Sequence, residues 1–202
     1  RCIVMVSKDA QRTMSTYLGI SQKLNEKDIN EDLIKKSKIL YLEGYLWDLD
    51  DAQSAIRKSI SIAKDNGTKI AFSVSDVFCI ERFRDSFIEI IKNDCDIVFA
   101  NEEEVKALIG ESNITEFSNS LVDKNKIFAV TRGDKGVSII SQSSKHELES
   151  EKIDNLVDTT GAGDIFAAGF LEYFIKNYEI EECGKRGIEL ASKIIQQYGA
   201  RF

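Results

Sequence analysis

The chain has 202 residues, the length of one ordinary domain, and its 43% hydrophobic and 30% charged residues are typical of a soluble globular protein. The net charge of −7 argues against nucleic acid and anionic membranes as partners, because both require a basic surface. We expect no signal peptide and no membrane span, since no apolar run reaches about 18 residues.

The four cysteines include no Cys-x-x-Cys pair, and the chain has a single histidine, so a zinc site is not expected. We therefore expect reduced thiols and a location in the cytoplasm. The chain starts at Arg1 inside an apolar, strand-like stretch, and we expect it to be a fragment of a longer protein.

Five apolar stretches are expected to be strands: residues 2–6, 38–42, 69–74, 96–100 and 127–131. The last four start about 30 residues apart, which is the spacing of strand–helix–strand units. Because these strands are apolar on both faces, we expect central parallel strands covered by helices. Residues 137–140 are expected to return antiparallel to the strand before them, and the polar stretch around His146 is expected to be solvated.

Residues 1–202 are thus expected to form a single α/β domain whose sheet is mostly parallel. In such sheets, ligands bind beyond the carboxyl ends of the strands. This rule selects four short segments as candidate site loops: residues 43–48, 75–78, 101–104 and 132–136.

The sequence DTTGAGD at residues 158–164 precedes apolar residues at helical spacing, so a helix is expected to start near Gly163. The first amides of a helix lack partners within the helix, and the small residues Gly161, Ala162 and Gly163 would let an anion approach them. Asp164 would lie in the first turn. The alternative is a tight turn in which Asp164 only caps the helix.

DTTGAGD resembles the C-terminal signature of the ribokinase-like, or phosphofructokinase B-type (PfkB), sugar and nucleoside kinases. Three further segments resemble that family in the same order: NEEE at 101–104, TRGDKG at 131–136 and ASKIIQQYGARF at 191–202. Residues 10–19 and 75–87 resemble its adenosine-kinase-like branch. The resemblance implies a doubly wound, mostly parallel sheet flanked by helices, with the family's lid sheet and amino-terminal part missing.

The resemblance implies that Asp164 is the general base and that the amides of Gly161, Ala162 and Gly163 hold the transferring phosphoryl group. Arg12 would stabilise the charge of the transition state, or else form an ordinary surface salt bridge.

By the same resemblance, Asn101 and Glu104 would organise Mg²⁺ through water, with Asn101 also on the nucleotide side; alternatively, Asn101 is only an N-cap. Thr131, Gly133 and Gly136 would line the nucleotide, or form a plain hairpin turn.

Asp158, Thr160 and Gly199 resemble a monovalent-cation site, which leaves open a bound K⁺. The implied activity is transfer of the γ-phosphate of ATP to a hydroxymethyl group of a sugar or nucleoside, such as adenosine, with Mg²⁺. The alternative is a nucleotide-binding or regulatory module that transfers nothing. The resemblance also leaves open a homodimer of the full-length protein.

Overall fold

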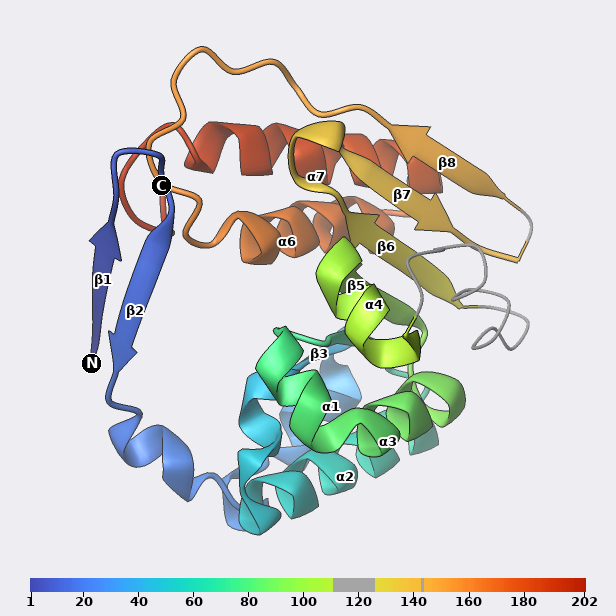
Figure 1. Ribbon diagram of the computed structural model, residues 1–202. Helices are drawn as coiled ribbons and strands as arrows, with labels where there is room; N and C mark the ends of the chain where they lie inside the picture. Colours follow the sequence, from blue (N-terminus) through green and yellow to red (C-terminus); the bar gives the residue numbers. More distant parts are fainter. Residues whose placement is uncertain (111–125, 143) are drawn as a thin grey trace. The chain divides into compact units, whose positions relative to one another are not determined.

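The computed structural model describes residues 1–110, 126–142 and 144–202 (Figure 1). These residues belong to two compact units. The glycine-loop unit comprises residues 1–19, 131–139 and 146–202, and the strand–helix unit lies within residues 20–130 and 140–145.

Six strands of the described chain form one sheet in the order β3-β4-β5-β6-β7-β8. They are β3 (Ile39–Glu43), β4 (Lys69–Ser73), β5 (Ile97–Asn101), β6 (Ile127–Thr131), β7 (Val137–Ile140) and β8 (Lys145–Leu148). The first three run parallel, with Tyr41 opposite Ala71 and Ala71 opposite Ile97. The expected strands at 38–42, 69–74, 96–100 and 127–131 are therefore confirmed to within one residue at each end.

Four helices of the strand–helix unit are α1 (Glu31–Lys36), α2 (Asp50–Asp65), α3 (Val77–Asn93) and α4 (Glu102–Ile109). The apolar face of α2 is buried, including Ala55 and Ile60. Phe87 of α3 is fully buried and packs edge-on against Phe72 of β4, with ring centroids 5.2 Å apart. This aromatic contact anchors α3 against the sheet. Because β3, β4 and β5 are parallel, their carboxyl ends lie at the same edge of the sheet.

The glycine-loop unit contains a strand pairing that the sequence did not predict. Residues 2–6 form β1 (Cys2–Val6) as expected, but β1 pairs antiparallel with β2 (Arg12–Thr16) in a separate two-stranded sheet, with Val4 opposite Met14. The polar stretch around His146 contains the strand β8, whose residues alternate between exposed and partly exposed, in keeping with the expected solvation. His146 is itself partly exposed, and its Nδ1 lies 3.6 Å from Glu181 Oε2.

Two helices of this unit, α6 (Ala162–Phe174) and α7 (Ile180–Ile194), pack closely because glycines meet at their contact. A Cβ at Gly169 would lie 2.9 Å from the Arg186 carbonyl oxygen and 3.1 Å from Gly187 Cα. A Cβ at Gly187 would lie 2.7 Å from the Phe166 ring. Only glycine at these positions permits the observed approach of the two helices.

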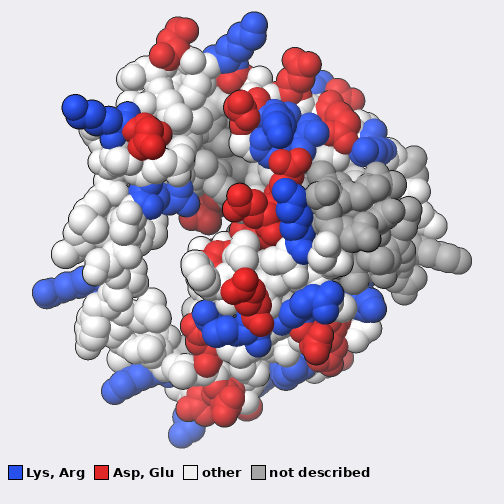
Figure 2. Space-filling model, viewed as in Figure 1, with Lys and Arg blue, Asp and Glu red and all other residues white. Residues whose placement is uncertain are grey.

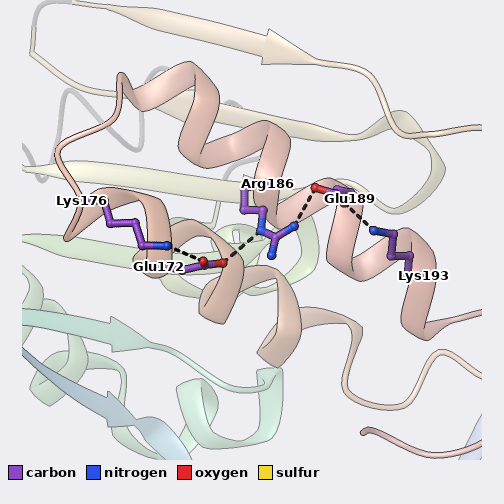
Figure 3. Close-up of polar contacts among 5 residues, drawn as sticks. All are labelled: Glu172, Lys176, Arg186, Glu189 and Lys193. Carbon is purple, nitrogen blue, oxygen red and sulfur yellow. Dashed lines mark hydrogen bonds and ion pairs between the residues drawn. The ribbon is translucent and has the colours of Figure 1, made fainter. Parts of the chain in front are cut away.

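Figure 3 shows a chain of ion pairs that joins the same two helices. Glu172 of α6 accepts from Lys176 at 2.7 Å and from Arg186 of α7 at 3.0 Å, and Arg186 also reaches Glu189 at 2.9 Å. These side chains are partly exposed, so screening by solvent keeps the stabilising effect of each pair small. The chain of pairs fixes the alignment of α6 on α7 more than it adds stability.

Within the described residues, none of the helices combines the length and the apolar character that crossing a lipid bilayer would demand. Acidic and basic side chains are interspersed over the face that Figure 2 displays.

Replacing Gly187 with alanine is expected to lower the free energy of unfolding by about 1–3 kcal/mol, because the new Cβ would overlap the Phe166 ring and carbonyl oxygen. Urea denaturation measures this change. Gly163→Ala is the matched control, because a Cβ at Gly163 meets nothing within 4 Å. The control should be as stable as wild type, or up to about 1 kcal/mol more stable. Equal stabilities of the two variants would contradict the packing described here.

Candidate active site

The glycine loop, residues 158–164, is held by the carboxylate of Asp158. Asp158 Oδ1 accepts from the Thr160 amide at 2.8 Å and from the Thr160 hydroxyl at 2.6 Å. Its Oδ2 accepts from the Gly199 amide at 3.0 Å. The amides of Val157 and Asp158 both donate to the Ile195 carbonyl at the end of α7. The three residues predicted as a cation site, Asp158, Thr160 and Gly199, therefore lie together.

Asp158 is a buried carboxylate, only 2% exposed, whose direct partners are all neutral. Desolvation by itself raises its pKa. The hydrogen bonds from Thr160 and Gly199, together with the nearby Arg12 charge, outweigh desolvation and hold the pKa below its ordinary value. Asp158 is therefore ionised at neutral pH.

Gly161 turns the loop into α6 with a left-handed backbone, at φ +77° and ψ 6°. A Cβ at this position would also lie 2.6 Å from the Ala200 Cβ. Backbone conformation and close approach both require glycine here. The contact also places the turn after α7 directly against the loop.

The start of α6 presents backbone amides that the protein does not use. Ala162 N donates weakly to Thr159 O at 3.3 Å, and the first helical bond runs from Ile165 N to Gly161 O at 2.9 Å. Within the described chain, the amides of Gly161, Gly163 and Asp164 have no hydrogen-bond partner. Gly163 is exposed, so an anion can reach these donors.

Asp164 stands third in α6, a position at which an acidic residue often caps a helix. Three other acids of this chain stand third in a helix. Asp28 bonds to Asn25 N at 3.0 Å and Glu104 bonds to Asn101 N at 2.8 Å, whereas no capping bond is made by Glu182 at the described start of α7. Asp164 makes no such bond and is exposed. The capping alternative therefore does not describe Asp164, whose carboxylate is free beside the open amides.

Arg12, at the start of β2, lies against the same loop. Its Nη1 donates to the Thr159 hydroxyl at 2.8 Å, and that hydroxyl donates to the Ala10 carbonyl at 3.3 Å. Across the described ranges no carboxylate lies within 4.0 Å of the Arg12 guanidinium. The alternative of a surface salt bridge is thus not observed, and the positive charge remains available.

Asn101 and Glu104 belong to the strand–helix unit and connect β5 to α4. Asn101 is the N-cap, accepting from Glu104 N at 2.9 Å, while its own amide N and Nδ2 each donate to Glu104 at 2.8 Å. Burial of the Glu104 carboxyl raises its pKa to about 7, against the lowering effect of the Asn101 bond. Asn101 therefore does cap α4, as the alternative interpretation states. Each carboxylate oxygen of Glu104 accepts one hydrogen bond from Asn101.

The segment after β6 is a tight turn. Gly136 has φ +87°, and a Cβ there would lie 1.9 Å from the Leu148 carbonyl oxygen. Arg132 N donates to Gly136 O at 2.8 Å, so the turn closes β6 onto β7. Packing accounts for Gly136. Gly133, at φ +60°, faces no heavy atom within 4 Å, and Thr131 ends the strand.

Two residues at the loop carried no role in the sequence analysis: Thr159, which binds Arg12, and Ala200, which contacts Gly161. Thr159 lies inside the DTTGAGD motif, yet no pattern shows that its hydroxyl reaches a residue 147 positions away. The glycine-loop unit therefore joins unused amides, an unpaired guanidinium and an exposed carboxylate, which is an arrangement for binding an anion beside a base.

A sequence model described as "pfkB family carbohydrate kinase" matches residues 1–202. The chain belongs to this family. The PfkB chain is similar in structure to the adenosine kinase from Sinorhizobium meliloti, with 37% sequence identity and a TM-score of 0.95 over 100% of this chain and 62% of that one. It is also similar to a probable sugar kinase from Rhizobium etli CFN 42, with 37% identity and a TM-score of 0.94 over 100% and 61% of the two chains.

Among curated proteins, an uncharacterized sugar kinase of Archaeoglobus fulgidus is 28% identical over 205 residues, covering 98% of the PfkB chain and 77% of the relative. The PfkB chain thus spans 62% and 61% of the two matched structures. The predicted family and the predicted mixed α/β fold are confirmed.

Asp158→Asn is expected to lower the free energy of unfolding by about 1–3 kcal/mol at neutral pH, because an amide nitrogen would face the Thr160 or Gly199 donors. The pKa of the Asp158 carboxyl is lowered in the folded protein. Its contribution to the free energy of unfolding is therefore fully present above the unfolded-state pKa of about 3.9, and it is lost as the pH falls through the folded-state pKa. The stability difference from wild type, measured by urea denaturation, should therefore shrink below about pH 4.

Asp154→Asn is the control, because Asp154 is exposed in the segment before the loop. A difference for Asp158→Asn that persisted unchanged to pH 2.5 would show that the carboxylate charge has no part in holding the loop.

Proposed function

We propose that the whole protein is a kinase that transfers the γ-phosphoryl group of ATP to a hydroxymethyl group of a nucleoside or sugar, with adenosine the first acceptor to test. The observation that carries this proposal is the exposed Asp164 carboxylate beside unused amides at the start of α6. The similarity to an adenosine kinase and to a probable sugar kinase supports phosphoryl transfer as the reaction class. It does not decide between a nucleoside and a sugar as the acceptor.

In the proposed reaction, the acceptor oxygen attacks the γ-phosphorus of ATP while its proton passes to Asp164. The new O–P bond forms as the bridging P–O bond to ADP breaks, and ADP leaves with the bond's electron pair. Phosphoryl transfer has a loose transition state in most analyses, so a weak base such as an ordinary carboxylate suffices. The proton reaches Asp164 without early formation of an alkoxide.

The amides of Gly161, Ala162 and Gly163 would hold the oxygens of the transferring group, since a helix start favours anions both by its free N–H groups and by its dipole. Arg12 would add a full positive charge near the same place. In phosphoryl transfer an arginine of this kind stabilises the charge that spreads over the equatorial oxygens.

Asn101 and Glu104 would hold Mg²⁺ through water. Each carboxylate oxygen of Glu104 accepts one hydrogen bond and keeps lone-pair capacity for a metal-bound water. When bound, the ion would neutralise phosphate charge. Thr131 and Gly133 would line the nucleotide, with Gly136 shaping the turn. We propose a nucleotide-binding role for Asn101 as well.

Asp158, Thr160 and Gly199 would hold K⁺. The support is chemical: Asp158 is an ionised, buried carboxylate whose direct partners are neutral, so a cation beside it would supply the missing counter-charge. We further propose a cytoplasmic location, in keeping with four free cysteines.

Asp164→Asn in the full-length protein is expected to lower kcat by about 10²–10⁴-fold, because the amide cannot take the acceptor proton. Steady-state rates with ATP against adenosine, ribose and fructose provide the measurement, and the melting temperature should change little. Asp51→Asn is the matched control, since Asp51 is an exposed first-turn aspartate of α2. Undiminished transfer by the Asp164 variant would refute the base assignment.

Gly163→Ala tests the anion site without disturbing the fold. Its Cβ projects into open space within the described chain, where the phosphoryl group is proposed to sit. We expect kcat/KM to fall roughly tenfold or more, because misplacing one such donor costs up to about 10²–10³-fold. Unchanged kcat/KM in a variant of normal stability would place the phosphoryl group elsewhere.

A further inference from the structure

The hydroxyl of Thr159 has two partners of different kinds. It accepts from Arg12 Nη1 at 2.8 Å and donates to the Ala10 carbonyl at 3.3 Å. Because the single hydroxyl proton is committed to Ala10, the oxygen lone pairs are directed toward Arg12. The backbone of the same residue accepts from Ala162 N, so Thr159 connects the β1–β2 turn to the glycine loop.

The turn that carries Ala10 is itself firmly held. Ser7 N donates to Gln11 O at 2.8 Å, and Ala10 N donates to Ser7 O at 3.0 Å. Ala10 adopts a left-handed φ of 60° although it is not glycine, and it is 2% exposed. A residue in this conformation persists only where its surroundings fix it. The Ala10 carbonyl is therefore a rigid anchor for the Thr159 hydroxyl.

The anchor for Arg12 is neutral, and this distinguishes it from the other partnered arginines. Five of them pair with carboxylates among the described residues: Arg57, Arg82, Arg84, Arg132 and Arg186. A carboxylate would cancel the guanidinium charge, whereas a hydroxyl fixes the geometry and leaves the charge for an incoming anion. Fixing a long arginine side chain in advance also reduces the rotamer entropy that is lost when the anion binds.

We propose that Thr159 is a positioning residue that holds Arg12 for the transition state of phosphoryl transfer. This inference rests on the proposed function, because it assigns Thr159 a part in that reaction. Thr159 does not contact the reacting atoms in this scheme; its hydroxyl acts through the guanidinium.

The test uses the full-length protein and compares Thr159→Val, which keeps the shape and loses the hydroxyl, with Thr159→Ser, which keeps the hydroxyl. Thr159→Val should lower kcat about tenfold with little change in the KM for ATP, and Thr159→Ser should restore most of the rate. Thr13→Val, an exposed threonine of β2, is the matched control and should leave kcat unchanged. Nitrogen-15 relaxation of the Arg12 Nε–H group should show a more mobile side chain in Thr159→Val than in wild type.

A double-mutant cycle separates positioning from a general effect on the fold. In an Arg12→Ala background, Thr159→Val should cause no further loss, since the residue through which it acts is gone. The inference is overturned if Thr159→Val lowers kcat equally in the wild-type protein and in the Arg12→Ala variant, or if it does not lower kcat in the wild-type protein. Neither result would contradict the proposed kinase activity. A wild-type protein that transfers phosphate to none of the acceptors overturns the proposed function itself, and this role with it.

Discussion

The buried carboxylate of Asp158 is the constraint on which the candidate site depends. It binds the amide and hydroxyl of Thr160 and the amide of Gly199, 41 residues further along the chain. The amides of Val157 and Asp158 also donate to the Ile195 carbonyl, so the start of the loop is tied to the end of α7 and to the turn that follows it. A buried charge is costly unless its hydrogen bonds are made, so the loop has one low-energy arrangement. That arrangement leaves the amides at the start of α6 unused by the protein.

Within the described residues, the first amides of α6 and the carboxylate of Asp164 have no protein partner and are open to solvent or to a ligand. The same chain closes two other helix starts with an acid at the third position, Asp28 and Glu104, whereas Glu182 at the start of α7 makes no such bond. At α6 a left-handed glycine takes the cap position, no side chain caps it, and Asp164 stays exposed. Departures from local rules of this kind tend to mark functional positions. The contrast lies within one molecule, so it does not depend on any relative.

The two charged side chains at the loop, Arg12 and Asp158, are both held by hydrogen bonds to neutral groups. Arg12 is fixed by a hydroxyl rather than by a carboxylate, so its charge is retained, while Asp158 is kept ionised by neutral donors. The helix that presents the amides is itself aligned by the glycine contacts and the ion-pair chain between α6 and α7 (Figure 3). The candidate site is thus positioned by a helix and a loop that are held by their own contacts, and donors fixed in this way need no rearrangement when an anion binds.

The sequence by itself determined the features that local pattern encodes. Apolar runs located β3, β4, β5 and β6, and the order of small residues before an apolar helix located the start of α6 and singled out Asp164. Only the tertiary structure decided that residues 2–6 pair with 12–16 in a separate sheet, that residues 145–148 form a strand, and that Glu104 caps its helix while Asp164 does not. It alone brought Thr159 to Arg12. The physical reason is that periodicity records which face of an element is apolar, whereas a hydrogen-bond partner is set by distances between segments that lie far apart in the chain.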